Sequence, residues 1–302
     1  MTEAAYECQD DCPLKDHDGN CYHRGDDGEV VQCVDDWAEE KYYYLERYLI
    51  ASREARNKFS VNGNAVYADL FAGPGICRLK RRKVEIAGGA LRARTLQEAP
   101  FNRFIVNDIS SDNYKALKTR LPGAEVYNED AKIVIDKIID DLLKTNYKYH
   151  FVFLDPFAPS VLPFSILRRL AELQRLDVML HFPIGPVRRN FKQWLKTQHA
   201  VLDDFLGTDK WRREVKGKPQ SHADNIIVSL YLEQLKTLGF PIEGLGLIDD
   251  TGKGYMSTTV AEIKNSKSVV LYYLILASKH PLGAKIWQST LKYDAAGQTR
   301  LL

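Results

Sequence analysis

The sequence VYADLFAGPG, residues 66–75, joins a mostly apolar run to a turn built from glycine and proline. Such a run fits a strand that is buried on both faces of a parallel sheet, and the turn marks where that strand ends. In an open α/β sheet, ligands bind beyond the carboxyl ends of the strands. Asp69 at the strand end can pair with a cationic amino group, and the small residues after it let a ligand approach the backbone closely. The stretch therefore predicts both a strand and a ligand site.

The spacing of the glycines indicates which ligand to expect. Gly73 and Gly75 are followed by Ile-Cys-Arg, so the dinucleotide-binding pattern Gly-x-Gly-x-x-Gly is not met. The Asp-x-Phe-x-Gly-x-Gly form instead resembles the first motif of S-adenosylmethionine-dependent methyltransferases. A purely structural turn is the alternative. The resemblance implies cofactor contacts from Asp69, Phe71, Ala72, Gly73 and Gly75.

Segments that fit strands alternate with segments of helical periodicity, and five such strands lie between residues 66 and 183. This alternation predicts a doubly wound, mostly parallel α/β sheet with helices on both faces and right-handed crossovers. The charged, helical residues 187–240 predict a helical insertion. The segments STTVAEI (257–263) and SVVLYYLILAS (268–278) are separated by four residues, so they predict an antiparallel hairpin. A hairpin at the end of such a sheet is found in many class I methyltransferases.

Two further acids follow the second and third predicted strands. Asp108 ends the segment FIVND, residues 104–108, and Asp130 ends AEVYNED, residues 124–130. A carboxylate at the second strand end can accept hydrogen bonds from both hydroxyls of a ribose. Methyltransferases of the resembled class often contact the adenine amino group at the place of Asp130 and Ala131. Each acid could instead cap the helix behind it, because aspartate is favoured there on local grounds.

The fourth predicted strand, HFVFLDPF at residues 150–157, ends in Asp155, Pro156 and Phe157. Methyltransferases that act on exocyclic amino groups of bases often carry Asp/Asn-Pro-Pro-aromatic here. The carboxylate and the proline carbonyl accept hydrogen bonds from the amine, and the ring stacks on a flipped base. In this chain one proline is missing and the aromatic residue comes one place early, which weakens the amino-methylation interpretation. A strand-to-helix turn in which Asp155 caps backbone amides is the alternative.

Three stretches together resemble the three-Cys-motif partner protein (TcmP) family: LFAGPG (70–75), FLDPF (153–157) and LYYLILASKHPLGAKIW (271–287). The resemblance extends from about Trp37 to Trp287. It implies a methyltransferase-like fold and a partner protein that carries the three-cysteine motif. The family name refers to the cysteines of the partner, so it does not account for the cysteines of this chain. The resemblance implies no particular substrate.

Four of the five cysteines fall within the first 33 residues. In a reducing cytosol such clustering favours a metal over disulfides, and four ligands can close a structural zinc site. The zinc hypothesis takes as ligands Cys8, Cys12, Cys21 and Cys33. The spacings are irregular and contain no Cys-x-x-Cys pair, so a polar arm that happens to carry thiols is the alternative. Residues 1–35 are predicted to form a cysteine-rich arm, and residues 36–302 the α/β domain.

A run of cations directly follows the glycine turn. It consists of Arg78, Lys80, Arg81, Arg82 and Lys83. Its position predicts that it lies near the active edge of the sheet and binds substrate. Such cations, with Trp194 and Trp211 near two further basic groups, fit phosphate contacts and base stacking by a nucleic acid. A solvated helical face, with cations paired to the abundant acids, is the alternative.

The composition limits the class of protein. The chain has 42 basic and 40 acidic residues and a formal net charge of +2, which is too near balance to identify a partner. No apolar stretch reaches the roughly 18 residues that a membrane helix needs. The first residues are acidic and polar, unlike a signal peptide. A cytosolic location is therefore expected.

The leading hypothesis is methyl transfer from S-adenosylmethionine to a base of RNA or DNA, with Asp155 orienting the acceptor and Phe157 packing against it. The step needs no metal, because it depends mainly on placing the nucleophile, the methyl carbon and the sulfur in line. A non-catalytic methyltransferase-like subunit, kept for assembly or nucleic-acid binding, is the second hypothesis. Methylation of a protein or a small molecule is the third.

Overall fold

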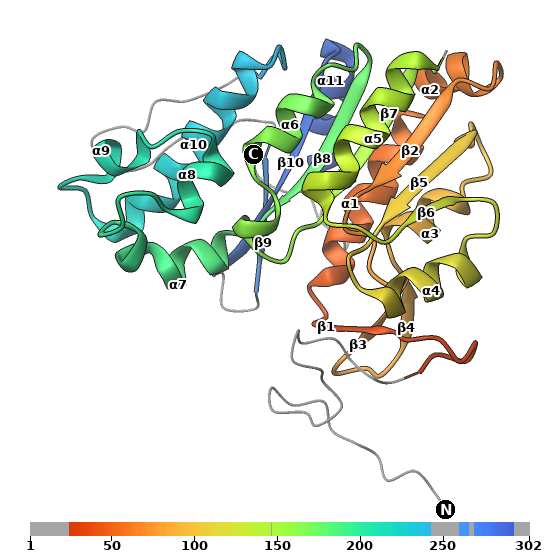
Figure 1. Ribbon diagram of the computed structural model, residues 1–302, viewed down its shortest axis with the longest axis horizontal. Coiled ribbons are helices and arrows are strands. Elements are labelled where there is room, and N and C mark those ends of the chain that lie inside the picture. The colour runs from red at the N-terminus through yellow and green to blue at the C-terminus, as the bar shows by residue number, and fades with distance from the viewer. Residues whose placement is uncertain (1–23, 146, 243–259, 266–268, 293–302) are drawn as a thin grey trace, which may run out of the picture.

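The computed structural model describes residues 24–145, 147–242, 260–265 and 269–292. Seven strands form one sheet in the order β6-β5-β2-β7-β8-β10-β9 (Figure 1). In that order they are Glu125–Tyr127, Arg103–Asn107, Ala65–Asp69, Tyr149–Leu154, Leu176–Phe182, Val270–Ser278 and Val260–Lys264. The first five are parallel, and β10 is antiparallel to both β8 and β9. The predicted fold class is confirmed: the sheet is doubly wound, mostly parallel, and consistent with a Rossmann-like methyltransferase fold.

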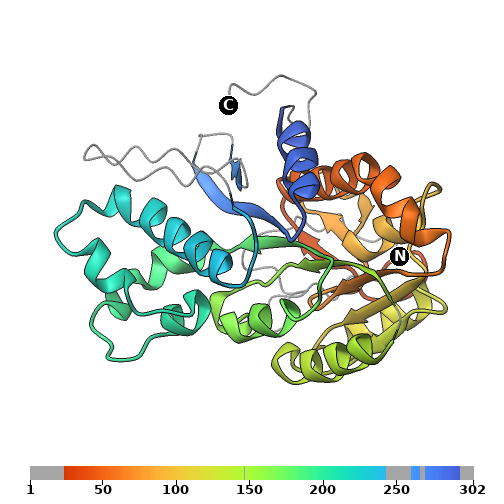
Figure 2. The same cartoon turned by 90° about the horizontal axis from the view of Figure 1, so that it is seen from above.

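Helices cover both faces of this sheet (Figure 2). One face carries α1 (Ala38–Ala51), α2 (Arg53–Ser60), α3 (Gly89–Arg94), α4 (Ser111–Arg120) and α11 (Pro281–Leu291). The other face carries α5 (Ala131–Lys144), α6 (Phe164–Leu170), α7 (Ile184–Trp194), α8 (Val201–Leu206), α9 (Trp211–Val215) and α10 (Gln220–Thr237), with a short 3-10 turn η1 (Pro159–Val161) after β7. Two helical layers around one sheet therefore give the chain its core.

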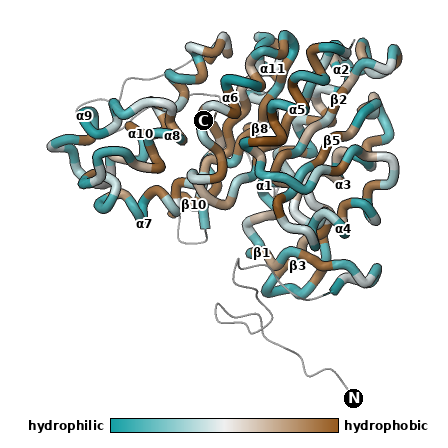
Figure 3. Tube along the Cα trace, in the orientation of Figure 1, coloured by the Kyte–Doolittle hydropathy of each residue, from teal (hydrophilic) through white to brown (hydrophobic). Residues whose placement is uncertain are grey.

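Alternation along each strand divides the core into two apolar clusters, because successive side chains in a strand point to opposite faces. In β2, Val66 and Ala68 belong to one cluster, whereas Ala65 and Tyr67 belong to the other. Hydrophobic residues are concentrated in the central strands, as Figure 3 shows. The near-continuous burial of β2 explains why its sequence reads as one apolar run.

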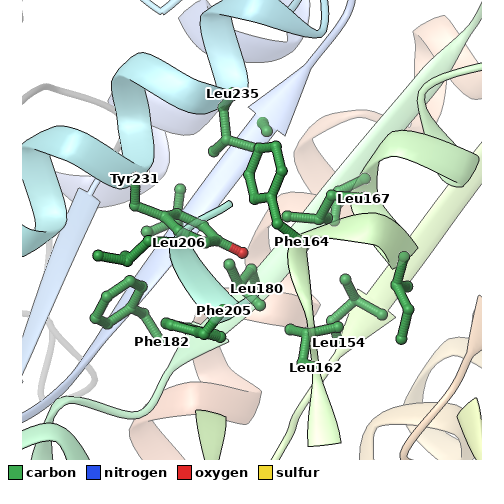
Figure 4. Packing of buried hydrophobic residues seen from close by; sticks show 14 of the residues in the cluster. Leu154, Leu162, Phe164, Leu167, Leu180, Phe182, Phe205, Leu206, Tyr231 and Leu235 are labelled. Carbon is green, nitrogen blue, oxygen red and sulfur yellow. The ribbon is translucent and has the colours of Figure 1, made fainter. Parts of the chain in front are cut away.

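The helical insertion packs onto the sheet. Phe164, Phe182, Phe205 and Tyr231 converge from α6, β8, α8 and α10 (Figure 4). The rings of Phe205 and Tyr231 stack with their centroids 5.1 Å apart, and those of Phe182 and Phe205 lie 4.9 Å apart. The residues between 187 and 240 therefore share the main apolar cluster and extend the α/β domain.

A second, three-stranded sheet lies beyond the carboxyl ends of the parallel strands (Figure 1). Its strands are β1 (Gln32–Val34), β3 (Ile76–Leu79) and β4 (Glu85–Ala87). β1 runs parallel to β3, and β3 runs antiparallel to β4. The basic run 78–83 is thus a strand and a turn, so the alternative of a solvated helical face does not apply to it. The reason is that β3 is held by β1, which is more than forty positions away in the chain.

Helices α1 and α2 follow each other directly along the chain, and Ser52 separates them. Among the described helices, none combines the length and apolar character that crossing a bilayer requires. Residues 257–259 of the predicted hairpin lie outside the described residues, and so do Cys8, Cys12 and Cys21. The described part of the chain contains no cluster of three or more His, Cys, Asp or Glu side chains that could hold a metal ion. The zinc hypothesis stays a prediction.

Candidate functional site

The order of the strands defines a switch point between β2 and β7. After β2 the chain builds β5 and β6 on one side, and it then returns to build β7 on the other side of β2. Open α/β sheets bind ligands in the crevice at such a point, beyond the carboxyl ends of the strands. In the register, Asp69 faces Phe153, two residues before Asp155. The acids predicted to serve the cofactor and the acceptor therefore lie at neighbouring strand ends.

Asp69, the last residue of β2, is 1% exposed. Its carboxylate accepts hydrogen bonds from the Phe71 amide at 3.1 Å and from the Tyr67 hydroxyl at 3.4 Å. Burial is the main cause that raises the pKa of Asp69 to about 8, and the nearby charge of Asp155 adds to it. Asp69 is therefore mostly protonated at neutral pH, and a cationic ligand group beside it would favour its ionised form.

The turn after β2 needs glycine at two positions. Gly73 and Gly75 have φ angles of +59° and +83°, in the left-handed region that glycine adopts without a steric cost. A Cβ at Gly73 would lie 2.9 Å from the Gln32 side-chain oxygen. The Gly75 carbonyl accepts a hydrogen bond from the Gly88 amide at 2.8 Å, which ties the turn to the start of α3. The turn is thus tied to the start of α3, and the Gln32 side chain of β1 leaves no room for a larger residue at Gly73.

Asp108, directly after β5, holds the glycine turn in place. One carboxylate oxygen accepts a hydrogen bond from the Gly73 amide at 2.9 Å. The other accepts from the Ser110 amide at 2.9 Å and from the Asn113 side chain at 3.1 Å. Burial raises the pKa of Asp108. The oxygen that faces Gly73 has capacity for a further donor, so ribose binding stays a prediction beside this structural role.

Asn107, the last residue of β5, was not singled out from the sequence. It is 1% exposed, and its side-chain amide donates to the carbonyls of Leu70 at 3.1 Å and Glu129 at 3.0 Å. It therefore joins the loops that follow β2 and β6. An amide at the end of the apolar run FIV is the local signal that could have identified it.

Asp130 is the N-cap of α5, and its side chain accepts a hydrogen bond from the Lys132 amide at 2.9 Å. Ala131 is buried in the first turn of that helix. The structure thus gives Asp130 the capping role, and adenine recognition by this pair stays a prediction. Two large apolar side chains are exposed at the same edge: Ile109 is 68% exposed and Ile133 is 59% exposed.

Asp155 is the centre of a charged trio drawn from three elements. Its Oδ2 pairs with the Lys41 ammonium of α1, and its Oδ1 lies 2.8 Å from Nδ1 of His181 in β8. Burial acts to raise the pKa of Asp155, but Lys41 and His181 together hold it well below its usual range. Burial lowers the pKa of His181. An anionic carboxylate thus stands between a cation and a neutral imidazole.

Lys41 and His181 are functional candidates that sequence reasoning missed. Lys41 is 6% exposed and lies four residues from both Trp37 and Leu45, so a cation interrupts the apolar stripe of α1. His181 interrupts the apolar strand LDVMLHFP. An ionisable residue within an apolar pattern is the signal in both cases. A core residue whose hydrogen bonds are all made within the protein gives the same pattern.

Pro156 and Phe157, which follow Asp155, differ in their exposure to solvent. The Pro156 side chain is buried, whereas Phe157 is 74% exposed. Burying a phenyl ring is ordinarily favourable. The exposed ring two positions after Asp155 is therefore largely free of intramolecular packing, and its contact with an acceptor stays a prediction.

The basic run is partly neutralised by acids. Lys80 lies 3.3 Å from a carboxylate oxygen of Asp35, and Arg82 pairs with Glu39. Arg78 is half-buried in β3, and Arg81 and Lys83 are exposed in the turn before β4. The run does lie beyond the carboxyl edge of the large sheet, as expected. Its role in substrate binding stays a prediction.

The interpretation of Trp211 as a base-stacking residue is wrong. Trp211 is fully buried, and its indole nitrogen donates a hydrogen bond to Asp203 at 2.6 Å. Trp194, at the end of α7, is half-buried. The exposed cations of α7 lie at spacings of three and four residues and so share one helix face: Arg189, Lys192 and, just past the helix end, Lys196.

Comparison with known proteins does not assign this chain to a family. No family model matches the chain, and no curated protein matches it. Protein LPL1258 from Legionella pneumophila, described by the family model DUF519, has a TM-score of 0.43 and 10% sequence identity, covering 83% of this chain and 91% of its own. The plantazolicin methyltransferase BamL, solved with a triazolic desmethylPZN analogue and SAH, has a TM-score of 0.30 and 10% identity, covering 80% and 91%. At these values neither similarity decides function, and the TcmP resemblance stays a prediction.

Proposed function

We propose that this protein is an S-adenosylmethionine-dependent methyltransferase. The observation that carries the proposal is the placement of the glycine turn at the switch point, with Asp69 on one side and Asp108 bonded to Gly73 on the other. Such a turn lets a ligand approach the backbone, and the acids supply groups for its polar ends. The antiparallel hairpin that completes the sheet accords with this class of enzyme.

The residues at this edge fit the cofactor chemically. Asp69 would face its cationic amino group, because a buried and protonated carboxyl becomes a carboxylate when a cation arrives. Asp108 would accept a ribose hydroxyl, and the exposed Ile109 next to it offers an apolar surface for a flat base. When bound, the cofactor would supply a methyl group on a sulfonium sulfur.

We assign a base of RNA or DNA as the acceptor. The exposed Phe157 ring lies two residues from Asp155, where it can stack on a base. Exposed cations at the same edge, Arg81 and Lys83 before β4 and Arg189 in α7, suit phosphate groups. A partner protein, implied by the TcmP resemblance, would complete or direct the acceptor site.

Calorimetric titration of the purified chain with S-adenosylmethionine and S-adenosylhomocysteine tests the cofactor. We expect saturable binding that weakens at least 100-fold in Gly73→Arg, because the new side chain would enter the turn and meet Gln32. Gly123→Arg is the matched control: Gly123 also has a positive φ, +81°, but a Cβ there would meet nothing within 4 Å. Wild-type protein that gives no heat at millimolar cofactor would refute the proposal.

Radiolabelled methyl transfer to separate RNA, DNA and protein fractions tests the acceptor. Label in either nucleic-acid fraction, lost in Phe157→Ala with cofactor affinity unchanged, supports the assignment. Label only in protein would contradict it. A change at Phe157 should leave the fold intact, because this ring is already 74% exposed.

A non-catalytic, methyltransferase-like subunit is the second candidate. One observation favours it: both oxygens of Asp155, the residue expected to orient the acceptor, are already engaged by Lys41 and His181. Tight cofactor binding with no label in any fraction, even with the partner protein added, would establish this candidate over the first.

A further inference from the structure

The trio of Lys41, Asp155 and His181 is costly to bury and stands where ligands bind. Each ion removed from water loses much of its hydration energy, which a pair regains only with good geometry. A buried ion pair is therefore weak evidence for stability, whereas perturbed ionisable groups gathered at a cleft are typical of functional sites. The three side chains come from α1, from the end of β7 and from β8, so the tertiary fold brings them together.

We propose that His181 accepts the proton that the acceptor loses during methyl transfer, and that Asp155 and Lys41 are its positioning residues. The inference rests on the proposed function and deepens it. It limits acceptors to groups that carry a proton to lose, such as an amino or a hydroxyl group. It also explains why the two carboxylate oxygens of Asp155 face Lys41 and His181.

The geometry assigns the two ring nitrogens of His181 different roles. Nδ1 lies 2.8 Å from Oδ1 of Asp155 without the geometry of a hydrogen bond, and the negative charge there would favour the tautomer that carries its proton on Nδ1. Nε2 then keeps its lone pair. The Tyr272 ring lies edge-on with its centroid 4.3 Å away, and the Tyr272 hydroxyl donates to the Trp37 carbonyl at 3.2 Å. The imidazole is thus held between α1, β7 and β10.

Charges around the imidazole suit a proton acceptor. Burial keeps the pKa of His181 below its ordinary value, and Lys41 acts in the same direction, so the ring is neutral at neutral pH. Asp155 opposes both and would stabilise the imidazolium once it forms. After proton uptake the trio would hold two cations around one carboxylate, with Lys41 at Oδ2 and the imidazolium at Oδ1 of Asp155.

The step balances with a sulfonium methyl donor as co-reactant. The acceptor lone pair forms the new bond to the methyl carbon, and the carbon–sulfur bond breaks with its electrons going to sulfur. The proton of the acceptor passes to Nε2 of His181, which becomes cationic beside Asp155. Proton transfer by a positioned side chain typically contributes about 10²–10⁴-fold in rate.

The opposite edge of the sheet supplies matched controls. His150, near the start of β7, is also buried, and its Nδ1 lies 3.3 Å from the Arg175 carbonyl. Asp177, near the start of β8, is buried and accepts hydrogen bonds from the hydroxyls of Tyr48 and Tyr149, both at 2.8 Å. These residues share the burial of the trio but lie away from the proposed site.

Nitrogen-15 NMR of histidine-labelled wild-type protein tests the tautomer without cofactor or acceptor. We expect the His181 signal, identified by its absence in His181→Gln or His181→Asn, to show a proton on Nδ1 and a bare Nε2 at pH 7.5. Asp155→Asn should shift the population toward the other tautomer, and Asp177→Asn should leave it unchanged. A proton on Nε2 in the wild type, either alone or as imidazolium, would overturn the proposal.

The role of His181 as proton acceptor is tested by measuring methyl transfer in the variants. The acceptor used is whichever of the RNA, DNA or protein fractions the wild type labels. We expect His181→Gln to lower kcat about 100-fold or more, to leave cofactor affinity within twofold and to abolish the rise of rate with pH. His150→Gln should stay within threefold of wild type. Equal activity in His181→Gln would end this inference while the proposed function stands. Absence of cofactor binding by the wild type would instead remove the proposed function, and this inference with it.

Discussion

Asp69 and Asp155 are the same amino acid at neighbouring strand ends, yet their surroundings move their pKa values in opposite directions. Burial raises the pKa of Asp69, although the Phe71 amide and the Tyr67 hydroxyl act to lower it. Lys41 and His181 instead hold the pKa of Asp155 well below its usual range. The same contrast separates acids from bases in enzymes, because the environment decides which carboxyl keeps its proton.

The raised pKa of Asp69 makes stability depend on pH. Between about pH 4 and pH 8 the native chain holds a proton at Asp69 that the unfolded chain has released, so the free energy of unfolding falls as pH rises. Asp69→Asn removes this dependence. We expect the variant to exceed wild type in stability by on the order of 2–5 kcal/mol at pH 8.5, with a difference that shrinks toward pH 4.

Urea denaturation at pH 5, 7 and 8.5 measures this difference. Asp112→Asn is the control, because Asp112 is half-exposed and pairs with Lys115 on the same helix. A stability gap between Asp69→Asn and wild type that does not change with pH would contradict the titration of Asp69. The variant should also bind cofactor more weakly, which separates its effect on the site from its effect on folding.

The start of α3 shows how a single element depends on close packing. A Cβ at Gly89 would lie 2.9 Å from two ring carbons of Phe153 and 3.3 Å from Leu45. The helix therefore begins directly against β7 and α1. Because α3 follows the glycine turn and β4, the position of this helix affects the edge of the sheet where the candidate site lies as well as the core.

We expect Gly89→Ala to reduce the free energy of unfolding by about 1–3 kcal/mol, because an added methyl group in a well-packed core forces the neighbouring side chains to shift. Phe153→Leu should also destabilise the chain, by leaving space in the core. The double variant should lose less than the sum of the two, since the shorter side chain makes room for the new methyl group. Strict additivity in a urea denaturation cycle would show that the contact with Phe153 is not the cause.

Across the molecule as a whole, the cations of the carboxyl edge come from separate parts of the chain. The turn between β3 and β4 supplies Arg81 and Lys83, and the face of α7 supplies Arg189, Lys192 and Lys196. Figure 1 shows the small sheet and α7 flanking the edge on which the candidate site lies. The near-neutral composition of the chain conceals this local concentration of positive charge.

Changing Arg189, Lys192 and Lys196 to serine should weaken RNA binding and flatten its dependence on salt. Each lost contact with a single-stranded phosphate lowers the slope of log K against log salt by about 0.7. The matched control changes Lys58, Lys144 and Lys148, which are exposed near the amino ends of the strands. Filter binding at several salt concentrations measures both slopes, and equal losses in the two variants would indicate only a change in net charge.

Local sequence patterns encode the main sheet and the place of its ligand edge. Apolar runs and helical periodicity are local, so they predict the five parallel strands with ends close to those observed, and they place Asp69 and Asp155 each at the end of a strand. The glycine turn is visible because a left-handed backbone selects glycine directly. Each of these features is encoded within about ten residues of chain.

The surroundings of those acids come from contacts between distant parts of the chain. Lys41 meets Asp155 across 114 positions of sequence, His181 reaches it from the next strand, and β1 pairs with β3 from far upstream. Such contacts leave no local pattern, because a cation on an apolar stripe or a short polar strand has many unrelated explanations. The same limit applies to Trp211, whose burial follows from neighbours supplied by the fold. The capping by Asp130 is local, and the sequence already offered it as an alternative. The sequence therefore specified where chemistry could occur, and long-range packing specified which groups stand there and in which charge state.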